Sequence, residues 1–402
     1  MKFSSQIMSF ILHFIFLVTF ICPIYSLETS NHQVNQTLRF EKGSQKLNKT
    51  IKTLLQQINK PAIKTIQSPD GDIIDCVLFH KQPAFDLPVL KGQISLDSQE
   101  NSEGHDQINN STLNFQPWHL SGEFCPNGTI PIRRTKEEEI QFGRKSIPFH
   151  ERLYEVVTYV QGAGYHGAKG TINVWSPRVE NNEESSSSKI WVQSLTAKES
   201  IEAGWQVCPK RFGDSRPRIF TYWTVDAYKG TGCYNLQCPG FVQTSRKVVP
   251  GTVVAPVSVI GGDQYDFNLK FEQDQKNQRW WLEYGAGNEN YERVGYWPFS
   301  LFKELNHEAN LIQFGGEVVD LNPTGDHTST YMGSGQFAQE LAFKAAYIKS
   351  MKVAINPYSY IDLLDNENIE ATPDCYSIVG GFNKNYESYI FFGGPGRNPK
   401  CP

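Results

Sequence analysis

From Leu153 to the C-terminus, short runs of β-branched and aromatic residues alternate with segments rich in glycine, asparagine, aspartate and proline. These runs recur roughly every 8–15 residues, which is typical of strands joined by turns. In Arg218–Thr224, successive side chains would point to opposite faces of a sheet. The runs that we expect to form strands are Val156–Val160, Thr171–Trp175, Ile190–Leu195, Arg218–Thr224, Val253–Ile260, Tyr265–Phe271, Arg279–Tyr284, Ala342–Val353 and Tyr389–Phe392. The pattern predicts an all-β domain, either an antiparallel sandwich or a barrel.

Three segments of this region depart from the strand pattern. Pro298–Asn310 has a proline near its start and apolar residues on one helical face, which predicts a helix. The Ser185–Ser188 tract follows two glutamates and indicates a surface loop. Gly162–Gly167 matches a dinucleotide-binding motif by its letters, but a strand follows where a helix would be needed. We interpret it as a hairpin turn.

The region before Leu153 is more polar and has a different pattern. Leu47–Ile58 predicts a short helix and Ile73–Phe79 a short strand. Ile130–Lys145 is rich in charge, so we expect it to be exposed and easily cut by a protease.

At the N-terminus, Lys2 is followed by a largely apolar run from Ile7 to Ile24 and then by the small residue Ser26. This arrangement is typical of a secretory signal peptide, here residues 1–26. The run is close to the ~18–20 residues that span a bilayer, so a membrane anchor is the alternative interpretation. No later segment is comparably long and apolar. We expect a protein that is secreted to the extracellular space or cell wall, or delivered to a vacuole, without stable membrane insertion after the signal is removed.

Charge and composition narrow the classes of partner. The chain has 38 Lys and Arg against 42 Asp and Glu, a balance that argues against a nucleic-acid partner. Five tripeptides match the N-glycosylation pattern, all before residue 130, and fit a secreted protein. The acceptor residues are Asn35, Asn48, Asn109, Asn110 and Asn127. Of the 8 cysteines, Cys22 lies in the signal peptide, so an odd number remains and one thiol is left without an intramolecular partner.

Motifs of the common hydrolases are absent from the sequence: no His-Glu-x-x-His, Gly-x-Ser-x-Gly, Asp-Thr-Gly or Asp-Ser-Gly occurs. The carboxylates of Glu202 in SIEAGWQV and Glu317 in FGGEVV are the remaining candidates for chemistry. Apolar surroundings would raise the pKa of such a carboxyl group, and two of them facing each other could share a proton and activate water. The alternative is that each is an ordinary salt-bridged or edge-strand acid.

Longer stretches of the chain resemble the plant neprosin family of secreted glutamic peptidases, which cleave after proline. PDGDIIDCV, QPAF and LKG resemble the activation peptide of that family. Seven further stretches resemble the catalytic domain of that family: AKGTINVWSPRV, IEAGWQV, FGDSRPRIFTYWTVDAY, TGCYNLQCPGFVQTS, GYWPFSLF, GGEVV and HTSTYMGSG. The resemblance implies a β-sandwich catalytic domain of two antiparallel sheets at 146–402, preceded by a smaller mixed prosegment at 27–145 that is removed at acid pH.

The resemblance also implies roles for particular residues. The paired catalytic glutamates fall on Glu202 and Glu317, and we lean to Glu202 as the base and Glu317 as the acid. The implied mechanism uses no metal, no cofactor and no covalent intermediate, and its partners are proline-containing peptides and the chain's own prosegment. Four aromatic residues near Glu202 could pack on a proline ring, although ordinary core positions are the alternative. They are Trp205, Tyr222, Trp223 and Tyr228.

Under this interpretation, six cysteines form three disulfides, although many other pairings are possible. The expected pairs are Cys76 with Cys125, Cys233 with Cys238, and Cys375 with Cys401. Cys208 is left as a free buried thiol. The competing function is a non-catalytic β-sandwich binding protein of the cell wall, which has no need to retain both glutamates and a prosegment. A peptidase with a preference for a residue other than proline is the third possibility.

Overall fold

The computed structural model describes residues 49–93, 116–144, 152–285, 290–320, 325–364, 367–370 and 372–402. The chain divides into two compact units, Met1–Thr50 and Ile51–Pro402, and every strand within the described residues lies in the second. The expected signal peptide and four of the acceptor asparagines, Asn35, Asn48, Asn109 and Asn110, lie outside the described residues. Asn127 is exposed in a turn.

None of the helices within the described ranges is both long enough and apolar enough to cross a bilayer.

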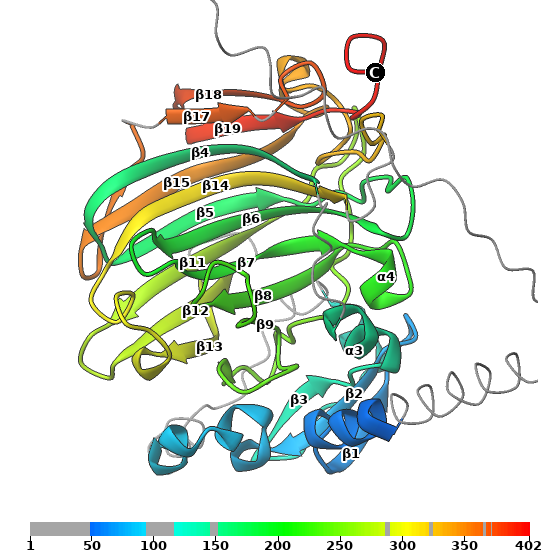
Figure 1. Cartoon of the computed structure of the whole chain (residues 1–402), viewed down its shortest axis with the longest axis vertical. Coiled ribbons are helices and arrows are strands. Elements are labelled where there is room, and N and C mark those ends of the chain that lie inside the picture. The colour runs from blue at the N-terminus through cyan, green and yellow to red at the C-terminus, as the bar shows by residue number, and fades with distance from the viewer. Residues whose placement is uncertain are drawn as a thin grey trace, which may run out of the picture. The chain divides into compact units, whose positions relative to one another are not determined.

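Seven antiparallel strands form one sheet, in the order β17-β4-β14-β6-β7-β8-β9 (Figure 1). Their bounds are β4 Arg152–Tyr165, β6 Glu184–Ser194, β7 Glu199–Val207, β8 Arg218–Thr224, β9 Cys233–Tyr234, β14 Ala309–Asp320 and β17 Glu367–Glu370. Strand β6 pairs with β14 on one side and with β7 on the other. The strands that carry Glu317 and Glu202 are therefore separated by β6 alone.

The second sheet has nine strands, in the order β10-β13-β12-β11-β5-β15-β19-β18, with β16 paired to β15. Their bounds are β5 Gly167–Asn173, β10 Val242–Gln243, β11 Asp266–Asp274, β12 Arg279–Gly285, β13 Glu292–Pro298, β15 Ala346–Asn356, β16 Ser359–Asp362, β18 Ser377–Asn383 and β19 Glu387–Gly393. Short helical turns lie in the connections: α4 Pro209–Phe212, η5 Phe299–Leu301 and η6 Ala338–Glu340.

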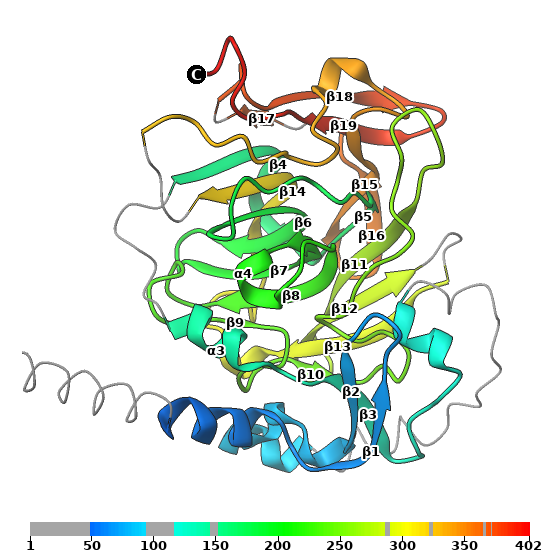
Figure 2. The ribbon, with the colours of Figure 1, turned by 90° about the vertical axis from the view of Figure 1, so that its right-hand side faces the viewer.

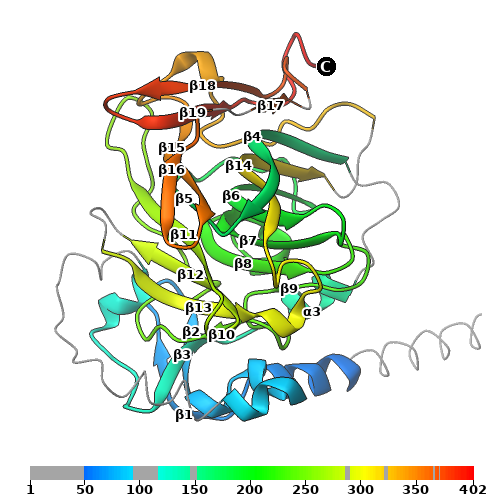
Figure 3. The same cartoon turned by 90° about the vertical axis from the view of Figure 1, so that its left-hand side faces the viewer.

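Buried apolar side chains from both sheets pack into one core. Ile201 and Phe314 of the seven-stranded sheet belong to the same buried cluster as Leu269 and Trp297 of the nine-stranded sheet. Figure 3 shows the two sheets lying face to face. The expected all-β fold, an antiparallel sandwich of two sheets, is confirmed, and the core uses only one face of the seven-stranded sheet. Its other face is free to carry polar groups.

The N-terminal region of the second unit is a separate mixed substructure (Figure 2). Its elements are the three-stranded antiparallel sheet β1 Ala62–Gln67, β2 Ile73–Leu78 and β3 Thr129–Arg133, the 3-10 helices η1 Phe79–Lys81, η2 Pro83–Asp86, η3 Pro88–Gln93 and η4 Pro117–Ser121, and α3 Glu137–Arg144. Residues 49–58 are helical, in agreement with the expected short helix. Phe85 and Ile130 pack in one buried cluster with Val242, Trp281 and Tyr296 of the sandwich. The region is thus attached to the sandwich through an apolar interface.

Two expectations about secondary structure are wrong for reasons of hydrogen bonding. Pro298–Asn310 is not a helix: β13 ends at Pro298, a 3-10 turn follows, and β14 begins at Ala309. The N–H groups of Lys303, Glu304 and Leu305 donate to the Glu199 carboxylate of β7 at 2.6–3.0 Å, so they are not available for helical bonds. Val253–Ile260 is not a strand apart from one bridge residue, Val253. Pro256 has no N–H to donate to a ladder.

Three further expectations are wrong because of tertiary packing. Ser185–Ser188 is not a surface loop but part of β6, buried between two paired strands. Gly162–Gly167 is not a hairpin, since β4 and β5 belong to different sheets and the chain crosses between them at His166. Within Ile130–Lys145, β3 and the side chain of Glu139 are buried rather than exposed.

Candidate active site

Glu202 and Glu317 lie on the same face of the seven-stranded sheet, opposite the core. On β6, the cross-strand neighbour of Glu202 is Trp191 and that of Glu317 is Ser187. Side chains of paired residues share a face, and so do residues two apart on one strand. Lys189, midway between Trp191 and Ser187, therefore points to the same face as both glutamates.

The Lys189 ammonium contacts both carboxylates. Its Nζ lies 2.8 Å from Glu202 Oε2 and 3.0 Å from Glu317 Oε1. The side chains are 6%, 2% and 12% exposed for Lys189, Glu202 and Glu317 in turn, so the three charges are largely shielded from water. Burial would lower the pKa of Lys189, but the two glutamates raise it above its ordinary value. The lysine is therefore a permanent cation at acid and neutral pH.

Glu202 has two further hydrogen-bond donors. The Tyr228 hydroxyl donates to Glu202 Oε1 at 2.5 Å, and the Ser200 hydroxyl donates to the same oxygen at 3.1 Å. Ser200 is two residues away on β7, and Tyr228 is in the loop that follows β8. Together with Lys189, three donors converge on this carboxylate. Hydrogen bonds of this kind stabilise the ionised form of a carboxyl group.

Glu317 has a different environment. Burial raises its pKa, Lys189 opposes the rise and Glu202 adds to it. Its cross-strand neighbour on β4 is a third carboxyl group, Glu155. Burial and the nearby Glu317 raise the pKa of Glu155 to about 7. The face thus combines one carboxyl group that accepts hydrogen bonds from three donors with a second whose pKa is raised by burial, a combination suited to general acid–base chemistry.

The structure separates the four aromatic candidates into two pairs. Tyr222 and Tyr228 stack beside Glu202, with ring centroids 5.7 Å apart and an interplanar angle of 17°. Trp205 is fully buried in the core and donates its indole N–H to the Asn173 carbonyl, while Trp223 packs against the same core. The substrate-binding prediction for Trp205 and Trp223 is therefore wrong. Trp205 is three residues from Glu202 on β7, and Trp223 is one residue from Tyr222, the cross-strand neighbour of Glu202 on β8. Residues an odd number apart on a strand point to opposite faces, so both tryptophans face away from the glutamates.

The structure contains the three expected disulfides, Cys76–Cys125, Cys233–Cys238 and Cys375–Cys401. Cys208 is buried with a free thiol, and burial raises its pKa. Across the described ranges, the one group of potential metal ligands within reach of a common ion is His327 with Cys375 and Cys401. Because these two cysteines are joined in a disulfide, they offer no thiolate to a metal.

Two members of the site are missing from the candidates drawn from sequence: Lys189 and Glu155. Lys189 follows the serine tract expected to be a loop, and Glu155 reaches the site only through the pairing of β4 with β14. The sequence does contain a signal for a further side chain beside the glutamates: a glycine two residues from each of them, Gly204 and Gly315. A glycine on the same face of the sheet as a glutamate leaves room there for a side chain from the neighbouring strand, here Lys189.

Comparisons with known proteins agree with the sequence resemblance. A family model described as Neprosin matches residues 182–395, more than half of the chain, and one described as Neprosin activation peptide matches residues 65–155.

Several solved structures are similar over part of the chain. Scytalido-glutamic peptidase with a peptide-based transition-state analogue is 8% identical, with 61% of this chain and 98% of that chain covered and a TM-score of 0.32. SCP-B, a member of the eqolisin family of peptidases in complex with the tripeptide Ala-Ile-His, is 7% identical, with coverage of 61% and 98% and a TM-score of 0.31. A functionally unknown protein from Saccharomyces cerevisiae is 10% identical, with coverage of 42% and 69% and a TM-score of 0.20.

Proposed function

The chain belongs to the neprosin family, and on that premise we propose that it is the secreted zymogen of a glutamic peptidase that cleaves after proline at acid pH. Family membership and the activation-peptide match support a peptidase zymogen. The observation that carries the proposed chemistry is the contact of Glu202 and Glu317 with one buried cation on the polar face of the sandwich. We assign residues 1–26 to the signal peptide, 27–145 to the prosegment and 146–402 to the catalytic domain.

In the proposed reaction, Glu202 is the general base and Glu317 the general acid. The Glu202 carboxylate takes a proton from water, and the water oxygen forms a bond to the carbonyl carbon of the proline residue. Protonated Glu317 donates to the carbonyl oxygen and stabilises the charge that develops there. Breakdown of the tetrahedral intermediate breaks the C–N bond, and a proton passes from a carboxyl group to the leaving amine. No covalent bond to the enzyme is needed.

The different environments of the two glutamates support these roles. Glu202 accepts hydrogen bonds from three donors, as a general base acting through a carboxylate would require, whereas burial and Glu202 raise the pKa of Glu317 and favour its protonated form. Activity requires the singly protonated pair of carboxyl groups. It should therefore peak at the pH where the pair binds one proton and fall at both lower and higher pH.

Proline preference is supported by the stacked rings of Tyr222 and Tyr228 beside Glu202. Tyr228 is 39% exposed, so part of its ring surface is available to a substrate. A flat aromatic ring offers good packing to a pyrrolidine ring, and Tyr228 is anchored by its hydroxyl on the catalytic base. The proposal is that this ring pair receives the proline side chain while the following peptide bond lies at the carboxyl pair.

The experiment is acid incubation of the secreted full-length protein, followed by assay on two quenched peptides that differ only in one internal residue, proline or alanine. Glu202→Gln and Glu317→Gln are the test variants, and Glu340→Gln, an exposed glutamate on η6, is the matched control. We expect cleavage after proline by the wild type and the control, and a loss of about 10²–10⁴-fold in both test variants.

Mass spectrometry locates the cut in the peptide and the point of prosegment removal. Equal cleavage of the proline and alanine peptides would contradict the proposed proline preference but leave the peptidase proposal intact. If the folded, trimmed wild type leaves both peptides intact between pH 2.5 and 7, the peptidase proposal is wrong and the binding protein becomes the better hypothesis.

A further inference from the structure

Lys189 has a glycine as its cross-strand neighbour on each side. It pairs with Gly315 of β14 and with Gly204 of β7. A Cβ atom at Gly204 would lie 2.0 Å from the Ser188 carbonyl oxygen, and one at Gly315 would lie 2.1 Å from the Val156 carbonyl oxygen. Neither position has room for a side chain, so Lys189 has no side chain directly beside it on either neighbouring strand.

Each glycine also stands two residues from one of the glutamates. Gly204 follows Glu202 in Glu-Ala-Gly, and Gly315 precedes Glu317 in Gly-Gly-Glu. Residues two apart on a strand share a face, so each motif supplies a carboxylate and an empty position next to it. Lys189 lies where the two empty positions meet, and from there its Nζ reaches both carboxylates. The ammonium also lies 4.5 Å from the centre of the Trp191 ring, which adds a cation–π contact.

The surroundings of the pair contain few other charges. The titratable and charged groups that face it from neighbouring elements are Glu155, Tyr222, Tyr228, Tyr234 and Arg211. Burial raises the pKa of the three tyrosines, so they are neutral at acid pH. Arg211 stacks on the Tyr234 ring at 3.7 Å. Of the described side chains, only Lys189 forms an ion pair with either glutamate.

We propose, on the basis of the function proposed above, that Lys189 is a positioning residue of the peptidase. Its fixed positive charge keeps one carboxyl group of the pair ionised at acid pH while the other is protonated, and so it sets the pH range of activity. Without this cation, two carboxyl groups in a desolvated site would both bind protons in acid, and the base would be lost. The pair would then become singly ionised only at higher pH.

Lys189→Met tests the proposal, because methionine keeps most of the length and removes the charge. Lys189→Arg retains the charge. Lys270→Met is the matched control, since Lys270 bridges Glu272 and Glu283 in the nine-stranded sheet, away from the site. Each secreted, folded variant is assayed for kcat between pH 2.5 and 8. In addition, ¹³C NMR of labelled glutamate carboxyl groups is followed against pH, with signals assigned from the Glu202→Gln and Glu317→Gln variants.

For Lys189→Met we expect the pH of half-maximal activity on the acid side to rise by at least about one unit, and the two carboxyl signals to titrate at higher pH by a similar amount. Lys189→Arg should keep the wild-type pH range with a lower kcat, and Lys270→Met should match the wild type in both readouts. The proposal is overturned if Lys189→Met lowers kcat equally at every pH and leaves the carboxyl titration unchanged. The NMR titration decides this even if the wild type cleaves no peptide, an outcome that would count against the peptidase alone.

Discussion

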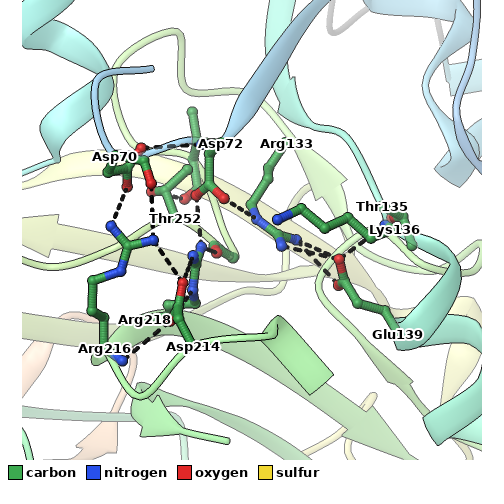
Figure 4. A network of polar contacts seen from close by, with 12 residues as sticks. Asp70, Asp72, Arg133, Thr135, Lys136, Glu139, Asp214, Arg216, Arg218 and Thr252 are labelled. Atoms are coloured by element: carbon green, nitrogen blue, oxygen red, sulfur yellow. Dashed lines mark hydrogen bonds and ion pairs between the residues drawn. The ribbon is translucent and has the colours of Figure 1, made fainter. Parts of the chain in front are cut away.

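Asp72 of the N-terminal region forms a buried ion pair with Arg218 of β8, with Oδ2 and Nη1 2.6 Å apart (Figure 4). The two side chains are 1% and 0% exposed. Arg133 of the proposed prosegment lies 3.3 Å from the other Asp72 oxygen, and Asp214 lies 2.6 Å from Arg218. One guanidinium group therefore joins a prosegment carboxylate to a carboxylate of the catalytic domain. Removing Asp72 would take away one of the two carboxylates that each of the buried Arg218 and Arg133 side chains contacts, which is unfavourable in a desolvated site.

We expect Asp72→Asn to weaken the attachment of the prosegment by about 3 kcal/mol, because Arg218 and Arg133 both lose a charged partner. Urea unfolding of the zymogen at neutral pH measures this loss. Asp75→Asn is the control, since Asp75 pairs with Arg134, which is 41% exposed and belongs to the prosegment itself. Equal destabilisation by the two variants would show that the Asp72 pair has no special role in the attachment.

The response of this network to pH should depend on Asp214. Burial alone would raise its pKa, but hydrogen bonds from Arg218 and Arg216 lower it well below the ordinary 3.8. A carboxyl group with a depressed pKa stabilises the fold above its ordinary pKa and loses that contribution as the pH falls through the folded-state value. Asp214→Asn should therefore lower the urea midpoint more at pH 6 than at pH 2, where part of the contribution has already been lost. A deficit of the same size at both pH values would contradict this assignment.

Other contacts of the prosegment do not titrate. The Gln82 side chain accepts from the Gln243 N–H and donates to the Gln243 carbonyl, at 2.9 and 3.1 Å. Gln116 makes the same pair of bonds with Val249, at 2.9 and 3.0 Å. These amide contacts persist in acid. The interface thus combines a carboxyl group with a shifted pKa, Asp214, with amide and apolar contacts that carry no titratable group.

The sequence predicts best where a rule is local. Arg218–Thr224 has the bounds expected for it, because a run of β-branched and aromatic residues indicates a strand without knowledge of its partners. The two glutamates could be singled out from their flanking residues and from the family motifs. Trp205 lies three residues from Glu202, and this odd spacing within one strand already indicates opposite faces.

What the sequence does not reveal is the register between distant strands. Lys189 meets Glu317 only because β6 pairs with β14, which lies more than a hundred residues further along the chain. Glu155 and Glu317 become neighbours through a similarly distant pairing. The serine tract before Lys189 is polar and small, so its local preference is for a loop; pairing on both edges of β6 overrides that preference.

The hydroxyl of Tyr228 is expected to support Glu202, the proposed base. Tyr228→Phe keeps the ring but removes the 2.5 Å hydrogen bond to Glu202. A hydrogen bond to a charged group contributes about 1.5–3 kcal/mol, so kcat on the proline peptide should fall by roughly 10- to 100-fold. Tyr347→Phe is the control, because its hydroxyl bonds to a carboxylate, Asp266, in the nine-stranded sheet. An unchanged kcat in Tyr228→Phe would mean that Glu202 does not need this donor.

Cys208 should be chemically silent in the folded protein. Its thiol is buried, and burial raises its pKa, so the reactive thiolate is disfavoured. We expect no reaction with a thiol reagent in the native state, one equivalent of reaction after unfolding without reductant, and full peptidase activity in Cys208→Ala. Rapid labelling of the native protein, or loss of activity in a folded Cys208→Ala variant, would assign the thiol a role that its burial does not suggest.

Glu155 should make the folded protein less stable as the pH rises. Burial and Glu317 raise its pKa from 4.5 to about 7. The folded state therefore loses stability as the pH rises from 4.5 to about 7, and the loss is complete above pH 7. Glu155→Gln removes the charge and should be more stable than the wild type at pH 8, by up to about 3 kcal/mol, and nearly equal to it at pH 4. Urea unfolding at both pH values measures the difference, with the exposed Glu340→Gln as a control that should show none. If Glu155→Gln differs from the wild type by the same amount at pH 4 and pH 8, Glu155 ionises without a penalty and its carboxyl group does not contribute to the electrostatics around Glu317.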